Sequence, residues 1–437
     1  SVPASRIGRL SKLGRLAGEL ASGMVSEGAR QIRQGQRPAL NSLLLTPTNA
    51  RRLAERLSEM RGAAMKIGQL LSMDNGQLLP PELSGILAKL RDVAHQMPLG
   101  QVNTVLQRNW GTGWDQQFKQ FAFTPLASAS IGQVHAATRR DGTRLAVKIQ
   151  YPDVQRMVEA DLKNLKVLLG NLIRLFSDID FDPIWEEVRE RLFEELDYLN
   201  EADNIRRTSA IQAECIDIIV PNVVQEASTR RVLTMEFVDG IPPAQAASQQ
   251  YPQELRDQWG VALFEFNLRS LLEHRFLHAD PNFANFAFRE DGKVVVYDYG
   301  CMKEIPADLA AGYARLVDAV LARRKTAIPG LLQDMGVFKE GGEPLPREMT
   351  DPYFDLVQDV VRASPPYTFG EDSSIYETLY ELGMSNWENA SDIRFPRDVV
   401  FINRTFAGLF GNLGKLRATG PWRTRLRSYI GPSATSA

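Results

Sequence analysis

Three features that mark large classes of protein are scarce or absent in this chain of 437 residues. It has only two cysteines, Cys215 and Cys301, which lie far apart and outside any metal-ligand spacing. This pattern argues against a disulfide scaffold and indicates a reducing compartment. The 51 lysines and arginines are balanced by 53 acidic residues, so no overall basic field supports binding to nucleic acid. No apolar run reaches the roughly 18 residues of a membrane span, so the sequence predicts no transmembrane segment.

The first 38 residues have a different charge balance from the rest. They carry seven arginines and lysines against Glu19 and Glu27, with apolar residues at about helical spacing. This pattern fits a basic amphipathic helix on an anionic membrane surface, and equally a frayed tail, since several glycines weaken the helix. We expect a soluble protein of a cytoplasmic or matrix-like compartment, with any membrane association peripheral.

The strongest chemical signal lies between Phe276 and Gly300. Asp280, Asn285 and Asp298 follow one another at spacings of five and thirteen residues, and Asp298 stands at the end of an apolar run that predicts a strand. Mg²⁺ prefers oxygen ligands and is usually held by one or two carboxylates together with phosphate oxygens and water. The pattern therefore predicts a metal site for a nucleotide phosphate, although Asp-Pro and Asp-Gly pairs are also common in turns.

The order of these residues is that of protein kinases. His278-Ala279-Asp280 stands where a kinase has His-Arg-Asp, and Asp298-Tyr299-Gly300 stands where it has Asp-Phe-Gly. Ala279 removes the arginine that usually pairs with an activation-loop phosphate. After Gly300 the chain reaches the next predicted helix without an Ala-Pro-Glu segment. The sequence thus predicts a kinase-like site without a regulatory activation loop or a peptide platform.

Upstream, a loop of small residues precedes two predicted strands joined by a turn at Asp141-Gly142. Small residues let backbone N–H groups approach a phosphate closely, and the candidates are Ala127, Ser128, Ala129 and Ser130. Lys148 ends an Ala-Val-Lys run in the second strand and matches the kinase lysine that contacts the α and β phosphates. The alternative is an ordinary exposed strand lysine.

One long helix is predicted from Ile184 to about Arg207. Within it, Glu201 is placed to pair with Lys148 as the kinase helix glutamate does, and Glu195 and Asp197 are additional acids.

Two apolar strands are then predicted at 218–224 and 231–237. In a kinase, the segment after the second strand is the hinge, whose backbone binds adenine. Glu236 and Val238 are therefore the candidate adenine-binding residues. Beyond them the chain is mainly helical, with helices predicted at 252–274, 306–324, 353–363, 374–382 and 396–413.

Near the N-terminus, Lys66 and Gln69 lie three residues apart on one face of a predicted helix. Such a pair is usually only solvated. Taken with the other motifs, however, it makes the chain resemble the UbiB/AarF-type atypical kinases, the family that includes the mitochondrial coenzyme Q supporters. The motifs that carry the resemblance are Lys66-Ile67-Gly68-Gln69, residues 127–135, Val147-Lys148, Glu195-Leu196-Asp197, residues 278–285 and Asp298-Tyr299-Gly300.

The resemblance implies an α+β, protein-kinase-like two-lobed fold with an all-helical N-terminal extension, helix-rich overall. The expected division is a basic tail at 1–38, the Lys-x-Gly-Gln extension at 39–110, an N-lobe at 111–240 and a helical C-lobe at 241–437. In that family the extension folds over the active site, so Lys66 and Gln69 are expected in the nucleotide site.

The resemblance also implies a role for each remaining residue. Glu195 and Asp197 would help to hold the extension, while Lys148 with Glu201 would position ATP. The remaining expected roles are Mg²⁺ binding at Asn285 and Asp298 and the catalytic-base position at Asp280.

The implied function is ATP-dependent support of isoprenoid quinone (ubiquinone) biosynthesis, as an ATPase or unorthodox kinase that uses Mg²⁺. Partners would be ATP, an isoprenoid or quinone-intermediate lipid or quinone-biosynthesis proteins, and an anionic membrane. Two alternatives stay open: a phosphotransferase with a small-molecule or protein acceptor, and a non-catalytic, nucleotide-gated scaffold for a lipid or a partner.

Overall fold

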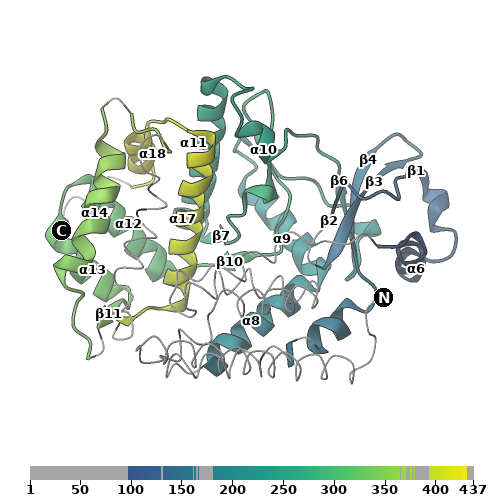
Figure 1. The fold of residues 1–437 in the computed structure, drawn as a ribbon, viewed down its shortest axis with the longest axis horizontal. Coiled ribbons are helices and arrows are strands. Elements are labelled where there is room, and N and C mark those ends of the chain that lie inside the picture. Colours follow the sequence, from purple (N-terminus) through teal and green to yellow (C-terminus); the bar gives the residue numbers. More distant parts are fainter. Residues whose placement is uncertain are drawn as a thin grey trace, which may run out of the picture. The chain divides into compact units, whose positions relative to one another are not determined.

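The structure is a computed structural model that describes residues 97–128, 131–160, 162, 163, 166, 181–339, 341–364, 366–370, 375, 378 and 393–430 (Figure 1). The predicted tail, most of the predicted extension with Lys66 and Gln69, and the loop residues Ala129 and Ser130 lie outside the described residues. The described residues form two compact units. One runs to Asn200 and includes Val224–Met235, and the other comprises Glu201–Val223 and the chain from Glu236 onward.

The first unit is built on an antiparallel hairpin at the centre of a sheet. The sheet order is β1-β3-β4-β6, with β2 paired to β3, and the strands are β1 (Phe118–Phe121), β2 (Ala127–Ser128), β3 (Gly132–Arg139), β4 (Arg144–Gln150) and β6 (Val232–Glu236). The predicted turn at Asp141-Gly142 is confirmed: Gly142 has a φ of 92°, which glycine adopts without strain, and the Thr143 amide donates to Asp141 Oδ1 at 2.9 Å.

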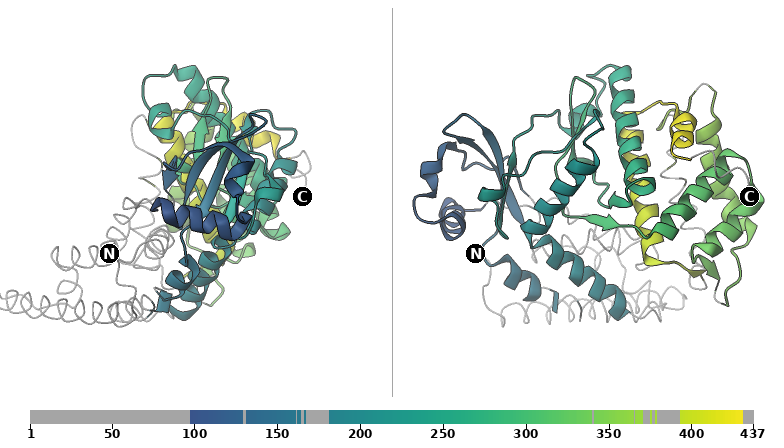
Figure 2. Two further views of the ribbon diagram at one scale, coloured as in Figure 1. Left: turned by 90° about the vertical axis from the view of Figure 1, so that its right-hand side faces the viewer. Right: turned by 180° about the vertical axis from the view of Figure 1, so that it is seen from behind.

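Helix α6 (Leu99–Trp110) packs on this sheet and shares its core (Figure 2). The helix buries Val102, Val105 and Leu106 at i, i+3 and i+4 spacing, the stripe expected of a helix with one apolar face. These residues belong to one cluster with Val147 and Ile149 of β4. The 3-10 helix η2 (Trp114–Gln117) follows and leads into β1. Residues 99–110 therefore pack with the sheet, and the predicted domain boundaries stay a prediction.

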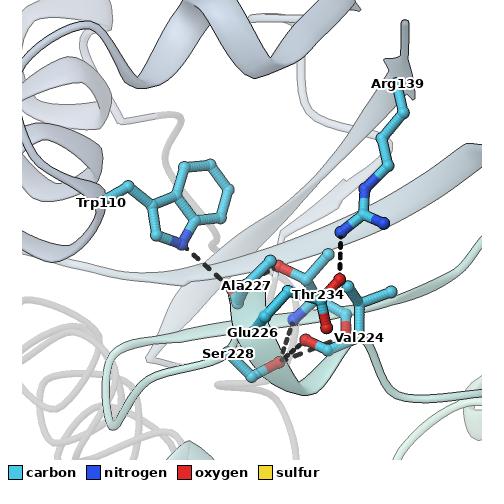
Figure 3. Close-up of polar contacts among 7 residues, drawn as sticks. All are labelled: Trp110, Arg139, Val224, Glu226, Ala227, Ser228 and Thr234. Atoms are coloured by element: carbon cyan, nitrogen blue, oxygen red, sulfur yellow. Dashed lines mark hydrogen bonds and ion pairs between the residues drawn. The ribbon is translucent and has the colours of Figure 1, made fainter. Parts of the chain in front are cut away.

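A second segment of chain returns to complete the first unit through a compact polar network (Figure 3). Around the 3-10 helix η3 (Gln225–Ala227), the Ala227 carbonyl accepts hydrogen bonds from Trp110 Nε1 at 3.1 Å and Thr234 Oγ1 at 2.8 Å. Ser228 Oγ donates to the Val224 carbonyl at 2.9 Å and accepts from the Thr234 amide at 3.1 Å. These bonds fix β6 beside α6 across more than one hundred residues of intervening sequence.

The prediction of one long helix from Ile184 to Arg207 is wrong. The chain forms α8 (Phe181–Glu195) and α9 (Tyr198–Ile211) instead. The break is stabilised on both sides: Gln150 Nε2 donates to the Leu196 carbonyl at 2.7 Å, and Asp197 Oδ1 accepts from the Leu199 amide at 3.0 Å. Asp is a favoured residue at a helix start because its side chain binds such amides.

The second unit is mainly helical. Its helices are α10 (Pro243–Ala246), α11 (Gln253–Leu272), α12 (Ala307–Leu321), α13 (Ile328–Asp334), α14 (Arg347–Arg362), α17 (Arg397–Leu416) and α18 (Trp422–Ser428), with 3-10 helices η4 (Phe283–Asn285) and η5 (Lys325–Ala327). Its strands are β5 (Ile218–Ile219), β7 (Phe276–His278), β8 (Phe286–Phe288), β9 (Val294–Val296), β10 (Met302–Glu304), β11 (Phe338–Lys339) and β12 (Ile393–Arg394). Most predicted helices are confirmed, but α14 begins six residues before the predicted start. The predicted helix at 374–382 lies almost wholly outside the described residues.

Helices α11 and α17 lie side by side in this unit (Figure 1). A Cβ at Gly260 of α11 would lie 2.3 Å from Ala418 Cβ, just beyond α17, so the contact depends on glycine. Leu271, Val399 and Ile402 belong to one apolar core shared by the two helices. Within the part of the chain that the structure describes, no helix combines the length and apolar character that a membrane crossing needs.

Candidate nucleotide and metal site

The hairpin of β8 and β9 brings Asn285 and Asp298 together. The two strands are antiparallel, with Phe286 paired to Val296, and the pairing extends one step further where the Tyr297 amide donates to the Asn285 carbonyl at 2.9 Å. Asp298 is the next residue. Two oxygen-bearing side chains thirteen positions apart in sequence therefore lie at the same end of one hairpin.

The loop before this hairpin is held by its own polar side chains. Asn285 Nδ2 donates to the Asp280 carbonyl at 3.3 Å. Asp280 Oδ1 accepts from the Asn282 amide at 3.2 Å, and Asn282 Oδ1 accepts from the Ala284 amide at 3.2 Å as the cap of η4. Asp280 is thus tied to Asn285, so the three predicted residues belong to one constellation.

His278 connects the loop that carries Asp280 to the Asp-Tyr-Gly turn. Its Nε2 lies 2.6 Å from the Asp298 carbonyl oxygen, and its side chain is buried. Strand β7 pairs with β10 on the far side of the turn, and the Ala279 amide donates to the Cys301 carbonyl at 2.8 Å. The turn is further closed by the Gly300 amide, which donates to Asp298 Oδ1 at 3.0 Å. Strand β10 and then α12 follow at once, as the absence of an activation-loop signature predicts.

Helix α9 holds the backbone of Tyr299 at both ends of the residue. Glu201 Oε1 accepts from the Tyr299 amide at 3.4 Å, and Asn204 Nδ2 donates to the Tyr299 carbonyl at 3.0 Å. Asn204 was missed in the sequence reading. Its signal was available, because it lies three residues after Glu201 and so shares its face of the helix. The predicted pairing of Glu201 with Lys148 stays a prediction.

Lys148 is not an ordinary exposed strand lysine. It lies on β4 opposite Val134, is 8% exposed, and its Nζ is 5.2 Å from the centroid of the Tyr198 ring. A cation over an aromatic face gains electrostatic stabilisation, which offsets part of the cost of burial. The alternative reading of this residue is therefore wrong.

The other predicted residues of the first unit occupy less enclosed positions. Ala127 and Ser128 form β2 and are exposed. Glu195 is the last residue of α8, and Asp197 caps α9 while lying 3.4 Å from Arg230 Nε. The structure gives no test of their predicted contact with Lys66 and Gln69.

At the predicted hinge, part of the backbone is already engaged. The Glu236 amide donates to the Asn222 carbonyl at 2.8 Å, and its carboxylate accepts from Asn222 Nδ2 at 2.9 Å. The Val238 carbonyl accepts from the Tyr297 hydroxyl at 2.7 Å. Burial, together with the nearby Asp239, raises the pKa of Tyr297 and keeps it a donor.

The chemistry of the donor set fits Mg²⁺ better than zinc. Among the residues that the structure describes, no group of three or more His, Cys, Asp and Glu side chains is arranged to hold a metal. An amide oxygen and a carboxylate from Asn285 and Asp298 match an ion that takes its other ligands from phosphate and water. The predicted roles of these residues stay predictions.

The fold and this constellation define a protein-kinase-like protein. Residues 89–330 match the sequence model of the ABC1 atypical kinase-like domain, and the chain belongs to that family. This confirms the resemblance to the UbiB/AarF-type atypical kinases. Among solved structures, the fold is similar to that of Rv3197 from Mycobacterium tuberculosis, which was solved as a complex with erythromycin. The TM-score is 0.66 at 27% identity, covering 89% of this chain and 97% of that one.

Two relatives show the extent of the similarity. The chain is 34% identical to the rat protein named "Atypical kinase COQ8B, mitochondrial", over 84% of this chain and 70% of the relative. It is 35% identical to the zebrafish protein of the same name, over 73% of this chain. The chain spans about half of that zebrafish relative (51%).

Proposed function

We propose that this protein binds Mg-ATP and hydrolyses it, or transfers its γ-phosphoryl group, in support of isoprenoid quinone (ubiquinone) biosynthesis. The observation that carries the proposal is the constellation of Asp280, Asn285 and Asp298 on one hydrogen-bonded loop and hairpin. Membership of an atypical kinase family supports it. The quinone role rests on the family resemblance carried by the motifs.

In this proposal Asn285 and Asp298 would hold Mg²⁺, which supplies charge neutralisation on the phosphates. Asp280 would accept a hydrogen bond from the attacking water or hydroxyl, and Lys148 with Glu201 would position the α and β phosphates. At the hinge the Val238 carbonyl is already bonded to Tyr297, so a purine would be recognised there through the Val238 amide, with the Glu236 carbonyl as the second group.

The close succession of Gly300, β10 and α12 favours water or a small acceptor over a peptide, since few residues are available to form a peptide platform. A protein acceptor is the second reading, and a nucleotide-gated scaffold is the third. Further proposed partners are an isoprenoid or quinone-intermediate lipid and quinone-biosynthesis proteins. We also propose that the protein associates peripherally with an anionic membrane.

The test uses the full chain and measures Mg-dependent ATP hydrolysis and nucleotide binding, with and without vesicles containing an anionic phospholipid. We expect Asp298→Asn to lower hydrolysis by at least about 100-fold, since it removes a charged metal ligand. The matched control is Asp308→Asn, in the exposed first turn of α12. Absence of nucleotide binding in every condition contradicts the proposal. Full quinone rescue by Asp298→Asn in cells would favour the scaffold.

The predicted extension is tested separately. If Lys66 occludes the site, Lys66→Ala should increase autophosphorylation while impairing quinone production. Unchanged autophosphorylation would contradict occlusion and leave the metal site untouched.

A further inference from the structure

Three consecutive carbonyl groups around Asp280 each accept a hydrogen bond from a side chain. The Ala279 carbonyl accepts from Arg404 Nη2 at 3.2 Å, the Asp280 carbonyl from Asn285 Nδ2 at 3.3 Å, and the Pro281 carbonyl from Asn412 Nδ2 at 2.8 Å. The carbonyl groups of a loop usually accept hydrogen bonds from backbone amides or from water. The peptide planes before Asp280 and after Pro281 are therefore held by side chains from a distant part of the chain, and the plane between these two residues is held by Asn285 of the same loop.

Two of the three donors come from one face of α17. Arg404 and Asn412 are eight residues apart, so they lie above one another along the helix with Gly408 between them. Asn412 is buried and Arg404 is 9% exposed. A buried face that presents donors to two carbonyls flanking a proposed catalytic residue is more specific than apolar packing.

Gly408 explains how α17 approaches so closely. A Cβ at this position would lie 2.4 Å from both Cβ and Cγ of Pro281, a separation that side-chain atoms do not adopt. Glycine inside a helix costs about 1 kcal/mol relative to alanine, so its presence here is accounted for by this contact. The helix therefore packs directly against the Pro281 ring.

Arg404 also brings an arginine side chain to the position at which this chain has Ala279. Kinases carry an arginine at the position of Ala279, and here a guanidinium reaches the Ala279 carbonyl from α17. It lies 5.7 Å from the centroid of the Phe401 ring, and its Nε has no hydrogen-bond partner within the described part of the chain. Keeping a charged group buried with incomplete hydrogen bonding is costly, which argues for a role beyond stability.

We propose that the Arg404–Gly408–Asn412 face of α17 is a template that sets the direction of the Asp280 side chain, with Arg404 and Asn412 as positioning residues. The inference rests on the proposed function for its catalytic consequence. A displacement of about 1 Å in a catalytic group can lower a rate about 100-fold. Loosening this template should therefore reduce turnover while leaving nucleotide affinity almost intact, because the nucleotide is held largely by other residues.

The first test compares two glycines of the same helix. Gly408→Ala should lower kcat for ATP hydrolysis by at least about tenfold with nucleotide Kd within about twofold. Gly414→Ala is the matched control, since among the described residues its Cβ would meet only Gly370 Cα at 4.0 Å, and both parameters should stay within about twofold.

The second test removes a donor without changing shape. Asn412→Asp should show the same loss of kcat, since a carboxylate would face the Pro281 carbonyl. Its control is Thr405→Val, which alters another buried polar group of α17. Within the described residues the Thr405 hydroxyl bonds only to the Phe401 carbonyl of the same helix. A merely structural role would change kcat and nucleotide Kd together in Asn412→Asp, whereas the proposed positioning role lowers kcat with Kd within about twofold.

Hydrogen exchange separates this inference from the proposed function. The amides of Ala284 and Asn285, which bond to Asn282, should exchange at least about tenfold faster in Asn412→Asp and Gly408→Ala. If the wild-type chain neither binds nor hydrolyses Mg-ATP, the proposed function fails and exchange alone decides whether α17 holds the loop. Unchanged exchange in both variants, or unchanged kcat in an active enzyme, overturns the inference.

Discussion

Asn204 donates its side-chain amide to the backbone carbonyl of Tyr299 at 3.0 Å, across 95 positions of sequence. With Glu201 accepting from the amide of the same residue, α9 binds both polar groups of the Tyr299 backbone. The aromatic residue of an Asp-Tyr-Gly turn therefore cannot rotate its peptide planes without losing bonds to α9. Since Asp298 is the preceding residue, α9 also fixes the backbone that carries the proposed metal ligand.

Replacing Asn204 by alanine should release the Tyr299 carbonyl. We expect the free energy of unfolding to fall by about 1 kcal/mol, the usual loss for one hydrogen bond, and Mg-dependent hydrolysis to fall about tenfold, equivalent to about 1.4 kcal/mol. Urea unfolding and steady-state kinetics check the two effects. Asp203→Ala, at the exposed neighbouring position, is the control. Equal effects in the two variants would contradict a specific role for Asn204.

Tyr299 and Tyr297 should respond oppositely to the same substitution. The Tyr299 hydroxyl is fully buried and has no hydrogen-bond partner in the described part of the chain, whereas the Tyr297 hydroxyl donates to the Val238 carbonyl. Tyr299→Phe should therefore raise the free energy of unfolding by about 1 kcal/mol, and Tyr297→Phe should lower it by about the same amount. Urea unfolding of both variants measures the difference. A fall in Tyr299→Phe would show that burial of the Tyr299 hydroxyl carries no net cost, and a rise in Tyr297→Phe would show that the bond to Val238 contributes no stability.

The parts of the site that the sequence predicted are those made by local geometry. Asp280, Asn285 and Asp298 lie on one loop and one hairpin, and a hairpin aligns its two ends through the pairing of its own strands. The order of motifs along the chain then placed them in the kinase-like fold. No contact between distant segments was needed for either step.

The parts that were missed depend on distant contacts. The donors of α17 act across 125 and 131 positions, and neither an arginine nor an asparagine within a helix announces a partner that far away. The break between α8 and α9 was missed in part for a related reason, since the bond from Gln150 to the Leu196 carbonyl is a tertiary contact. The other contribution is local, because Asp197 binds the Leu199 amide as a helix cap, and this signal was available in the sequence.

Gly132 and Gly100 should respond oppositely to alanine. A Cβ at Gly132 would lie 2.2 Å from the Ile149 carbonyl oxygen, a backbone atom of the paired strand, whereas at Gly100 in α6 it would meet no atom of the described residues within 4 Å. Gly132→Ala should lower the free energy of unfolding of the first unit by about 3 kcal/mol, while Gly100→Ala should raise it by about 0.5 kcal/mol. Thermal unfolding distinguishes the two. A Gly132→Ala variant as stable as the wild type would mean that β3 and β4 can separate without cost.

His135 should make the first unit less stable in acid. Its ring is buried, stacks on Phe121 with centroids 5.6 Å apart, and has Nδ1 2.9 Å from the Ala122 carbonyl. Its Nε2 has no hydrogen-bond partner within the described part of the chain. Burial lowers the pKa of His135, although the bond to Ala122 opposes this.

Because the folded-state pKa lies below the ordinary value of about 6.5, the unfolded chain binds more protons between the two values. Stability from the neutral ring is therefore fully present above about pH 6.5 and is lost as the pH falls toward the folded-state pKa. The measurement is exchange of the Ala122 amide, which bonds to the Ala136 carbonyl, at about pH 7.5 and about pH 5.5 after correction for intrinsic exchange. Protection should fall on acidification in the wild type and change less in His135→Gln. An identical response of the two proteins would show that this histidine remains neutral, or is protonated without cost, across that range.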